Sequence, residues 1–107
     1  MAKITTTENG QEQTHEVSIK LWMPKESYRS IIRYYVSGEC SGEKKTYGYL
    51  DITENKWVAE DGVSVDLSIK CLLLALSYTR KVGVLTEERL SEMIKVVKTM
   101  KEGRVAA

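Results

Sequence analysis

The residues best suited to nucleophilic chemistry are a cysteine between two glycines and the single histidine of the chain. Residues 38–42 read GECSG, which places Cys40 in a G-x-C-x-G pattern, a cysteine variant of the nucleophile elbow. That elbow requires a strand before it, a helix after it, and an acid and a histidine downstream. His15 lies upstream of Cys40 and a helix is expected before the pattern, so residues 38–45 are predicted to form an ordinary glycine-containing loop.

Other chemical roles would need partners that the spacing of these residues does not supply. A histidine beside a thiol favours the nucleophilic thiolate, but no sequence feature brings His15 to Cys40, and we expect His15 to be a solvated strand residue. One histidine and two cysteines do not provide the four ligands of a structural zinc site. We therefore expect no catalytic residues, no metal and no cofactor. A cysteine-dependent enzyme that uses Cys40 is the third and weakest hypothesis.

Basic side chains and aromatic rings gather in the middle of the chain, where they could form a binding surface. Three basic residues spaced by four would form one stripe on a helix, two lysines follow in the loop, and Tyr47 and Tyr49 would share one face of a strand. Cations that neutralise phosphates and rings that stack on bases are what single-strand binding requires. The alternative is a solvated helix face with cross-strand aromatic packing. The candidate binding residues are Lys25, Arg29, Arg33, Lys44, Lys45, Tyr47, Tyr49 and Trp57.

Length and composition are those of one ordinary globular domain, which we expect to span residues 1–107. With 42% hydrophobic and 29% charged residues, bulk disorder is not expected. A net charge of +1 argues against a protein that is strongly basic as a whole and binds nucleic acid or membrane surfaces in that way. No leader peptide and no apolar run of membrane-spanning length is recognisable. The expectation is a cytoplasmic protein with reduced thiols and no membrane partner.

The N-terminal part of the chain is predicted to form an antiparallel hairpin. Residues 2–7 form a β-branched run, and an Asn-Gly turn signal follows. Residues 14–23, THEVSIKLWM, alternate between apolar and polar side chains with the period of a half-buried strand. The intervening QEQ is expected to make the loop longer than a two-residue turn.

A helix is predicted over residues 25–37, after Pro24 and before Gly38. Proline suits the first turn of a helix, and apolar residues at 28, 31, 32, 35 and 36 follow the helical period. The β-propensity of IIRYYV favours the alternative, a strand. The stretch HEVSIKLWMPKESYRSII resembles the front of ribbon-helix-helix repressors, with a strand, then P-K-E, then an amphipathic helix. The family's second helix has no counterpart, because GECSGEKKTYGYLDI follows, and the chain is not assigned to that family.

Strands and turns are predicted to alternate through the next section. TYGYLDI at residues 46–52 and KWVAE at residues 56–60 are strand-like, and TENK turns the chain between them. Gly48 within the first of these strands is expected to mark a bulge or close packing. The dipeptide Asp61-Gly62 is a strong turn signal, and residues 63–65 alternate beyond it. A three-stranded meander is the result.

Two helices are predicted at the C-terminus, over residues 66–82 and 86–102. Apolar positions cover most of the circumference of the first helix, so it is expected to be buried nearly all round. Asp66 would either cap its start or interact favourably with the positive end of the helix dipole, and Gly83 would end the helix. Thr86 begins the second helix, and Gly103 is expected to stop it.

The predicted fold is α+β: an antiparallel sheet of four or five short strands, one helix between the hairpins, and a C-terminal antiparallel helix pair packed on the sheet. An apolar side left on the helix pair is compatible with a homodimer. The leading functional hypothesis is a small non-enzymatic interaction protein, an adaptor or inhibitor that binds another protein, since Tyr and Trp suit protein interfaces. By fold-level analogy, such a domain fits an origin on a mobile element. The alternative is a nucleic-acid-binding module.

Overall fold

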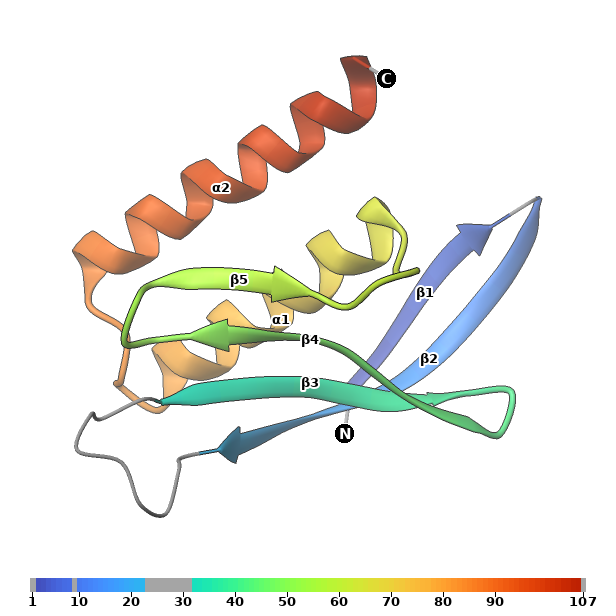
Figure 1. Ribbon diagram of the computed structural model, residues 1–107, viewed down its shortest axis with the longest axis horizontal. Helices are drawn as coiled ribbons and strands as arrows, with labels where there is room; N and C mark the ends of the chain where they lie inside the picture. Colours follow the sequence, from blue (N-terminus) through green and yellow to red (C-terminus); the bar gives the residue numbers. More distant parts are fainter. Residues whose placement is uncertain (1, 9, 23–31, 107) are drawn as a thin grey trace.

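The computed structural model describes residues 2–8, 10–22 and 32–106. These residues form one α+β domain, a curled five-stranded antiparallel sheet followed by two helices (Figure 1). The strands follow the chain in the order β1-β2-β3-β4-β5. Helix α1 packs on one face of the sheet, and α2 packs on α1. The elements are β1 Ala2–Glu8, β2 Gln11–Trp22, β3 Arg33–Cys40, β4 Glu43–Asp51, β5 Lys56–Ala59, α1 Val65–Lys81 and α2 Glu87–Ala106.

The helix predicted over residues 25–37 is wrong where the structure describes it. Residues 25–31 lie outside the described part, and residues 33–37 belong to β3, so the described chain has no helix between its hairpins. Strand β3 pairs with β2 on one side and β4 on the other, and this two-sided pairing overrides the helical spacing of its apolar residues. Gly38 does not stop a helix. It lies within β3, where an added Cβ would overlap the carbonyl oxygen of Glu16.

Two hairpins are tighter than predicted. Strands β1 and β2 pair as far as Glu8 and Gln11, so QEQ belongs to β2 and not to a loop. Strands β3 and β4 pair as far as Cys40 and Glu43, which leaves Ser41 and Gly42 as a two-residue turn. Both turn residues have positive φ, 54° and 81°, as a type I′ turn requires. The predicted loop over residues 38–45 is therefore mostly strand, and Cys40 is not on a nucleophile elbow.

A β-bulge in β4 changes which side chains share a face. Val36 pairs with Gly48 but Ser37 pairs with Thr46, so Tyr47 is an extra residue in β4. The bulge turns Tyr47 into the core, where it is 1% exposed, while Tyr49 lies on the opposite face of the sheet. The prediction that Tyr47 and Tyr49 share a face is therefore wrong, because strict alternation does not hold across a bulge.

Strand β5 and the Asp61-Gly62 turn are confirmed, but the third strand of the predicted meander is not formed. Val63 and Ser64 lead directly into α1, and the Ser64 hydroxyl accepts a hydrogen bond from the Leu67 amide at 3.2 Å. Ser64, and not Asp66, is thus the N-cap. Asp66 lies in the first turn of α1, which confirms the alternative that it lies at the positive end of the helix dipole, and its carboxylate pairs with Lys70 at 3.2 Å.

The two C-terminal helices are confirmed, with one change at the end. Gly83, with φ 78°, follows α1, and the Thr86 hydroxyl accepts from the Arg89 amide at 3.2 Å at the start of α2. Gly103 does not stop α2, which continues to Ala106. An interior glycine weakens a helix by about 1 kcal/mol, which the preceding turns can overcome. No helix in the described residues is long and apolar enough to cross a membrane.

The core lies between α1, the sheet and α2. Leu72 and Ala75 of α1, Met93 of α2, and Val36 and Leu50 of the sheet are fully buried in one cluster. The sheet and α2 therefore cover two sides of α1, as its apolar circumference predicted. The third side remains open, because Leu73 is 42% and Tyr78 41% exposed, so burial of α1 nearly all round is wrong.

Candidate binding surface

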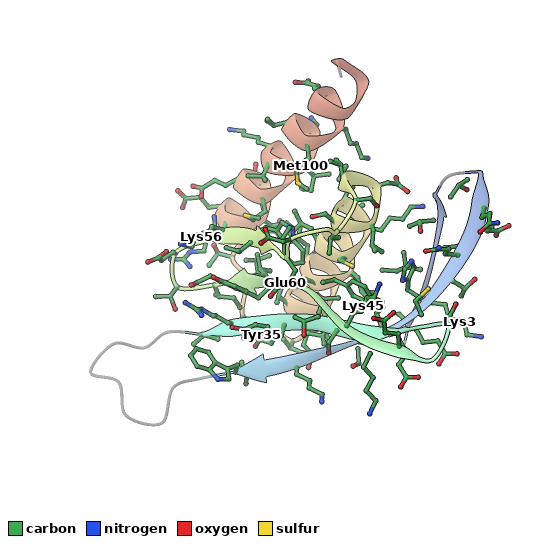
Figure 2. The ribbon with its side chains drawn as sticks, turned by 45° about the vertical axis from the view of Figure 1, so that its right-hand side comes forward. Lys3, Tyr35, Lys45, Lys56, Glu60 and Met100 are labelled. Carbon is green, nitrogen blue, oxygen red and sulfur yellow. The ribbon has the colours of Figure 1, made fainter. Side chains whose placement is uncertain are left out.

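The sheet face opposite α1 carries a group of aromatic rings around one arginine, which we name the aromatic–arginine cluster. Successive cross-strand pairs place its members side by side: Trp22 pairs with Arg33, and Tyr35 pairs with Tyr49. In the described part of the chain no helix covers this face, and Tyr35 lies far from Met100 of α2 (Figure 2). We call this surface the open face.

Arg33 is the centre of the cluster. Its guanidinium carbon lies 5.2 Å from the ring centroid of Trp22 and 4.6 Å from that of Tyr49, within cation–π range. Its Nη1 donates to the Tyr35 hydroxyl at 3.4 Å. The rings also contact one another, since Tyr35 lies 5.0 Å from Tyr49 and 6.2 Å from Trp22 between centroids. Each side chain therefore holds the others in place.

The charge of Arg33 is balanced within the cluster. Its Nε lies 3.6 Å from a carboxylate oxygen of Asp51, a residue that is 2% exposed and pairs with Arg33 across the strands. Asp51 also accepts a hydrogen bond from the Glu54 amide at 3.0 Å. The hydrogen bond with Tyr35, and then the nearby Tyr49 and Asp51, raise the pKa of Arg33 above its ordinary value. The cluster therefore presents rings and a neutralised cation.

A polar hollow of about 340 Å³ adjoins the cluster on the same face. Gly38 contributes no side chain to it, and the lining side chains come from β2, β3 and β4. Acidic and basic groups are mixed there, with hydroxyls between them. The residues that line the hollow are Glu16, Ser18, Lys20, Ser37, Gly38, Glu39 and Lys44. The open face thus has an aromatic part and a polar part side by side.

The candidate residues named from the sequence are distributed over several surfaces. Arg33 and Tyr49 belong to the cluster, and Lys44 lines the polar hollow. Lys45 lies 3.9 Å from Glu43 near the β3–β4 turn. Trp57 is half-buried on the helix side, where its Nε1 donates to the Ser68 hydroxyl at 2.8 Å. Tyr47 lies in the core, and Lys25 and Arg29 lie outside the described residues.

Sequence reasoning missed Trp22 and Tyr35, which complete the cluster. The alternation of residues 14–23 puts Trp22 on the face opposite His15 and Val17. Tyr35 was assigned to the apolar stripe of a helix that does not form. A strand assignment for IIRYYV would have put Arg33 and Tyr35 on one face and Tyr34 and Val36 on the other.

The prediction that His15 is solvated is wrong. His15 is 3% exposed and hydrogen-bonds the Tyr47 hydroxyl through Nδ1 at 3.1 Å and the Thr6 hydroxyl through Nε2 at 3.3 Å. This network joins β1, β2 and β4 within the core. Buried polar groups that are satisfied in this way stabilise one arrangement of the strands.

Cys40 and Cys71 are both free thiols. Cys71 is fully buried in α1, and this burial raises the pKa of its thiol to about 12. A thiol in that state is protonated at neutral pH and is a poor nucleophile. In the parts of the chain that the structure describes, no three His, Cys, Asp or Glu side chains form a group that could hold a metal ion.

Comparisons of the chain with protein-family models, with curated proteins and with solved structures find no match.

Proposed function

We propose that this chain is a non-enzymatic binding protein, an adaptor or inhibitor, that contacts another protein through its open face. The observation that carries the proposal is the aromatic–arginine cluster. Trp, Tyr and Arg are the residue types that contribute most to binding energy at protein interfaces. Trp22 is 42% exposed, and Tyr35 and Tyr49 are half-buried, so their rings are held by neighbours and still offer surface to a partner.

The arrangement around the cluster supports the same proposal. Protein interfaces have a centre of aromatic and apolar side chains with a polar rim. Here the polar hollow adjoins the cluster on one side, and Val58 of β5 pairs with Tyr49 on the other. Side chains that already contact one another lose little conformational freedom when a partner binds. A rigid, mostly uncharged centre of this kind suits a folded protein surface.

Single-stranded nucleic acid is the second candidate partner, favoured by the rings of Tyr35 and Tyr49 on an uncovered sheet face. Bases stack on such rings, but affinity also needs cations that are free to neutralise phosphates. Arg33 is paired with Asp51, Lys56 with Glu54 at 2.6 Å, and Lys45 with Glu43. Lys20 and Lys44 of the same face share the polar hollow with Glu16 and Glu39. Cations mixed with carboxylates in this way favour a protein partner over a polyanion.

Affinity capture from the native host, followed by mass spectrometry, tests the proposal. The bait is the whole chain, as the wild type and as the double variant Trp22→Ala/Tyr49→Ala. Leu73→Ala, which removes a large side chain of α1 that is as exposed as Trp22, is the matched control. We expect one protein to be captured by the wild type and the control and to be lost with the double variant.

A parallel titration with a fluorescent oligothymidylate separates the two candidate partners. Binding that weakens steeply with salt and disappears with the double variant would contradict the protein-partner proposal. Capture that is equal for all three baits would contradict the assignment of the open face.

A further inference from the structure

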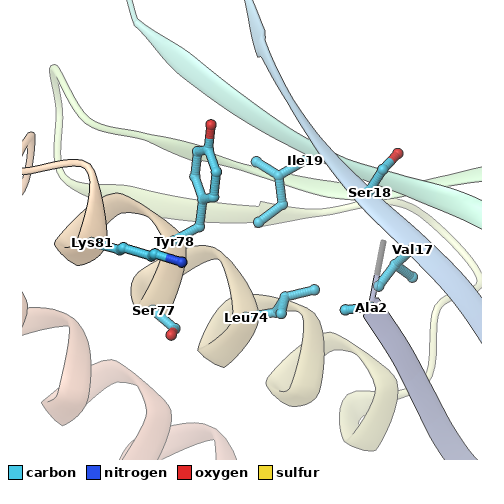
Figure 3. A pocket seen from close by; sticks show the side chains of 8 residues that line it. All are labelled: Ala2, Val17, Ser18, Ile19, Leu74, Ser77, Tyr78 and Lys81. Carbon is cyan, nitrogen blue, oxygen red and sulfur yellow. The ribbon is translucent and has the colours of Figure 1, made fainter.

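A second surface, on the helix side of the sheet, forms a groove between α1 and strands β1 and β2 (Figure 3). The groove has a volume of about 420 Å³, within the range of about 300–1,000 Å³ typical of ligand sites. Leu74 faces Ala2 across its floor, and the ring of Tyr78 stands beside Ile19. Tyr78 is positioned by buried Tyr34, with the two ring centroids 5.8 Å apart. The groove is thus mainly apolar and has a fixed aromatic wall.

The groove lies along a part of β2 that is paired on one side only. Among the described residues, the β1–β2 ladder runs as far as the pair of Ala2 with Val17, while the β2–β3 ladder continues to Trp22. In the described part of the chain, residues 18–22 therefore have a strand neighbour on the β3 side and none on the other. Alternate residues of an antiparallel strand direct their N–H and C=O groups to each side, so this segment offers hydrogen-bonding groups beside the groove. Leu21, 55% exposed, lies in the same segment.

Charge at the groove favours one kind of occupant. Lys81 is the one charged side chain among the described residues that line it, and Ser18 and Ser77 supply the hydroxyls. An occupant with a carboxylate near its apolar side chain would complement Lys81. An extended backbone would complement residues 18–22, whereas a helix satisfies its backbone groups internally and would leave the strand edge unpaired.

We propose that this groove binds an extended acidic–apolar peptide of a partner protein, which adds to β2 as a strand. The peptide backbone pairs with residues 18–22. An apolar side chain enters between Ile19, Leu74 and Tyr78, and a neighbouring Asp or Glu pairs with Lys81. Specificity comes from alternate side chains and affinity from the backbone pairing, as in other cases of strand addition. The groove lies on the opposite face of the sheet from the aromatic–arginine cluster, although both use residues of β2, and it goes beyond the function proposed for the open face.

Selection of random twelve-residue peptides displayed on phage, with the wild-type chain as bait, tests this site. We expect enriched peptides to alternate apolar and polar residues and to carry Asp or Glu. A synthetic, fluorescent copy of the most enriched peptide is then titrated against four variants. Leu74→Glu is expected to weaken binding by at least about tenfold, and Leu73→Glu, a control on the exposed side of α1, to leave it unchanged.

Lys81→Glu provides a test that does not depend on the folding of Leu74→Glu, because Lys81 is exposed. It is expected to weaken the acidic peptide several-fold and to strengthen a copy in which Lys replaces the acidic residue. Tyr49→Ala changes the open face and is expected to leave peptide binding at the groove intact. The peptide titration therefore tests the groove independently of the function proposed for the open face.

Four outcomes would overturn the proposal: no enriched peptide, helical peptides, binding insensitive to both Leu74→Glu and Lys81→Glu, or a dimer of the chain that closes the groove, measured by light scattering.

Discussion

Alkaline pH is expected to destabilise this domain through one buried thiol, Cys71. In the unfolded chain this thiol ionises near its ordinary pKa of 9.0, whereas in the folded chain burial raises the pKa to about 12. Between these values the unfolded chain has released the proton and the folded chain still holds it. Rising pH therefore favours unfolding, and the free energy of unfolding falls with a slope that approaches about 1.4 kcal/mol per pH unit.

The size of this effect can be worked out for a convenient pH range. At pH 8 about a tenth of the unfolded thiols are ionised, and at pH 10 about nine tenths, so Cys71 lowers the free energy of unfolding by about 1.4 kcal/mol between these values. Below pH 8 the Cys71 thiol is protonated in both the folded and the unfolded chain, so its ionisation does not reduce the free energy of unfolding there. The figure hardly depends on the folded value, because any folded pKa well above 10 leaves the native thiol protonated throughout this range.

Urea unfolding followed by circular dichroism at pH 8, 9 and 10 measures the effect. Cys40→Ala serves as the background, so that Cys71 is the only thiol, and is compared with Cys40→Ala/Cys71→Ala. Tyr34 and Tyr47, whose pKa values are raised mainly by burial, are present in both proteins, and Cys71 is the smallest of the causes that raise the pKa of Tyr47, so the tyrosine contributions nearly cancel in the difference. The stability difference between the two proteins should change by about 1.4 kcal/mol in favour of the double variant from pH 8 to pH 10. A difference that stays constant with pH would refute the burial argument.

Three further changes probe the structure that holds the two surfaces. Tyr47→Phe removes the hydroxyl bonded to buried His15 and should lower the free energy of unfolding by about 1–3 kcal/mol in urea titrations, whereas a smaller loss than for Tyr34→Phe would contradict the network. Gly38→Ala should abolish folding or shift the thermal midpoint down strongly, since its Cβ would overlap the Glu16 carbonyl; a wild-type midpoint would contradict the close approach of β2 and β3. Ser64→Ala removes the N-cap hydroxyl of α1 and should lower the free energy of unfolding by about 1 kcal/mol. An unchanged urea midpoint would contradict the assignment of Ser64 as the N-cap.

Much of the fold follows from local patterns in the sequence. The Asn-Gly turn and the alternation of residues 14–23 predict the first hairpin, and the apolar runs predict both C-terminal helices. The first residue of a helix is harder to predict from the sequence. Ser64 and Asp66 are both suited to a helix N-terminus, and only the hydrogen bond from the Leu67 amide to the Ser64 hydroxyl identifies Ser64 as the N-cap of α1.

The errors arise where distant residues decide the structure. Residues 33–37 satisfy a helical and an extended pattern almost equally, and pairing with both β2 and β4 decides in favour of the strand. His15 is buried because Tyr47, 32 residues away, supplies a hydrogen-bond partner. Gly48 in TYGYLDI is a local signal for the bulge and for close packing, and both are confirmed, but it does not show that the bulge turns Tyr47 inward.

Two of the four residues of the aromatic–arginine cluster were named from the sequence, and the other two were missed because pairing between distant strands brings them together. Arg33 and Tyr49 were named from residue type, but the reason given for Arg33, a stripe with Lys25 and Arg29, depended on a helix that does not form at Arg33. Cross-strand register brings Trp22 and Tyr35 to these two residues, and register follows from the complete sheet.

Site-directed photo-crosslinking is the most direct measurement of the central claim, that the open face binds another protein. The photoreactive residue p-benzoylphenylalanine replaces Tyr49 in one sample and Leu73, exposed on α1, in the other, and both proteins are irradiated in extract of the native host. We predict one protein adduct of defined mass from position 49 and none of that mass from position 73. A nucleic-acid adduct at position 49, or the same protein adduct from both positions, would contradict the account.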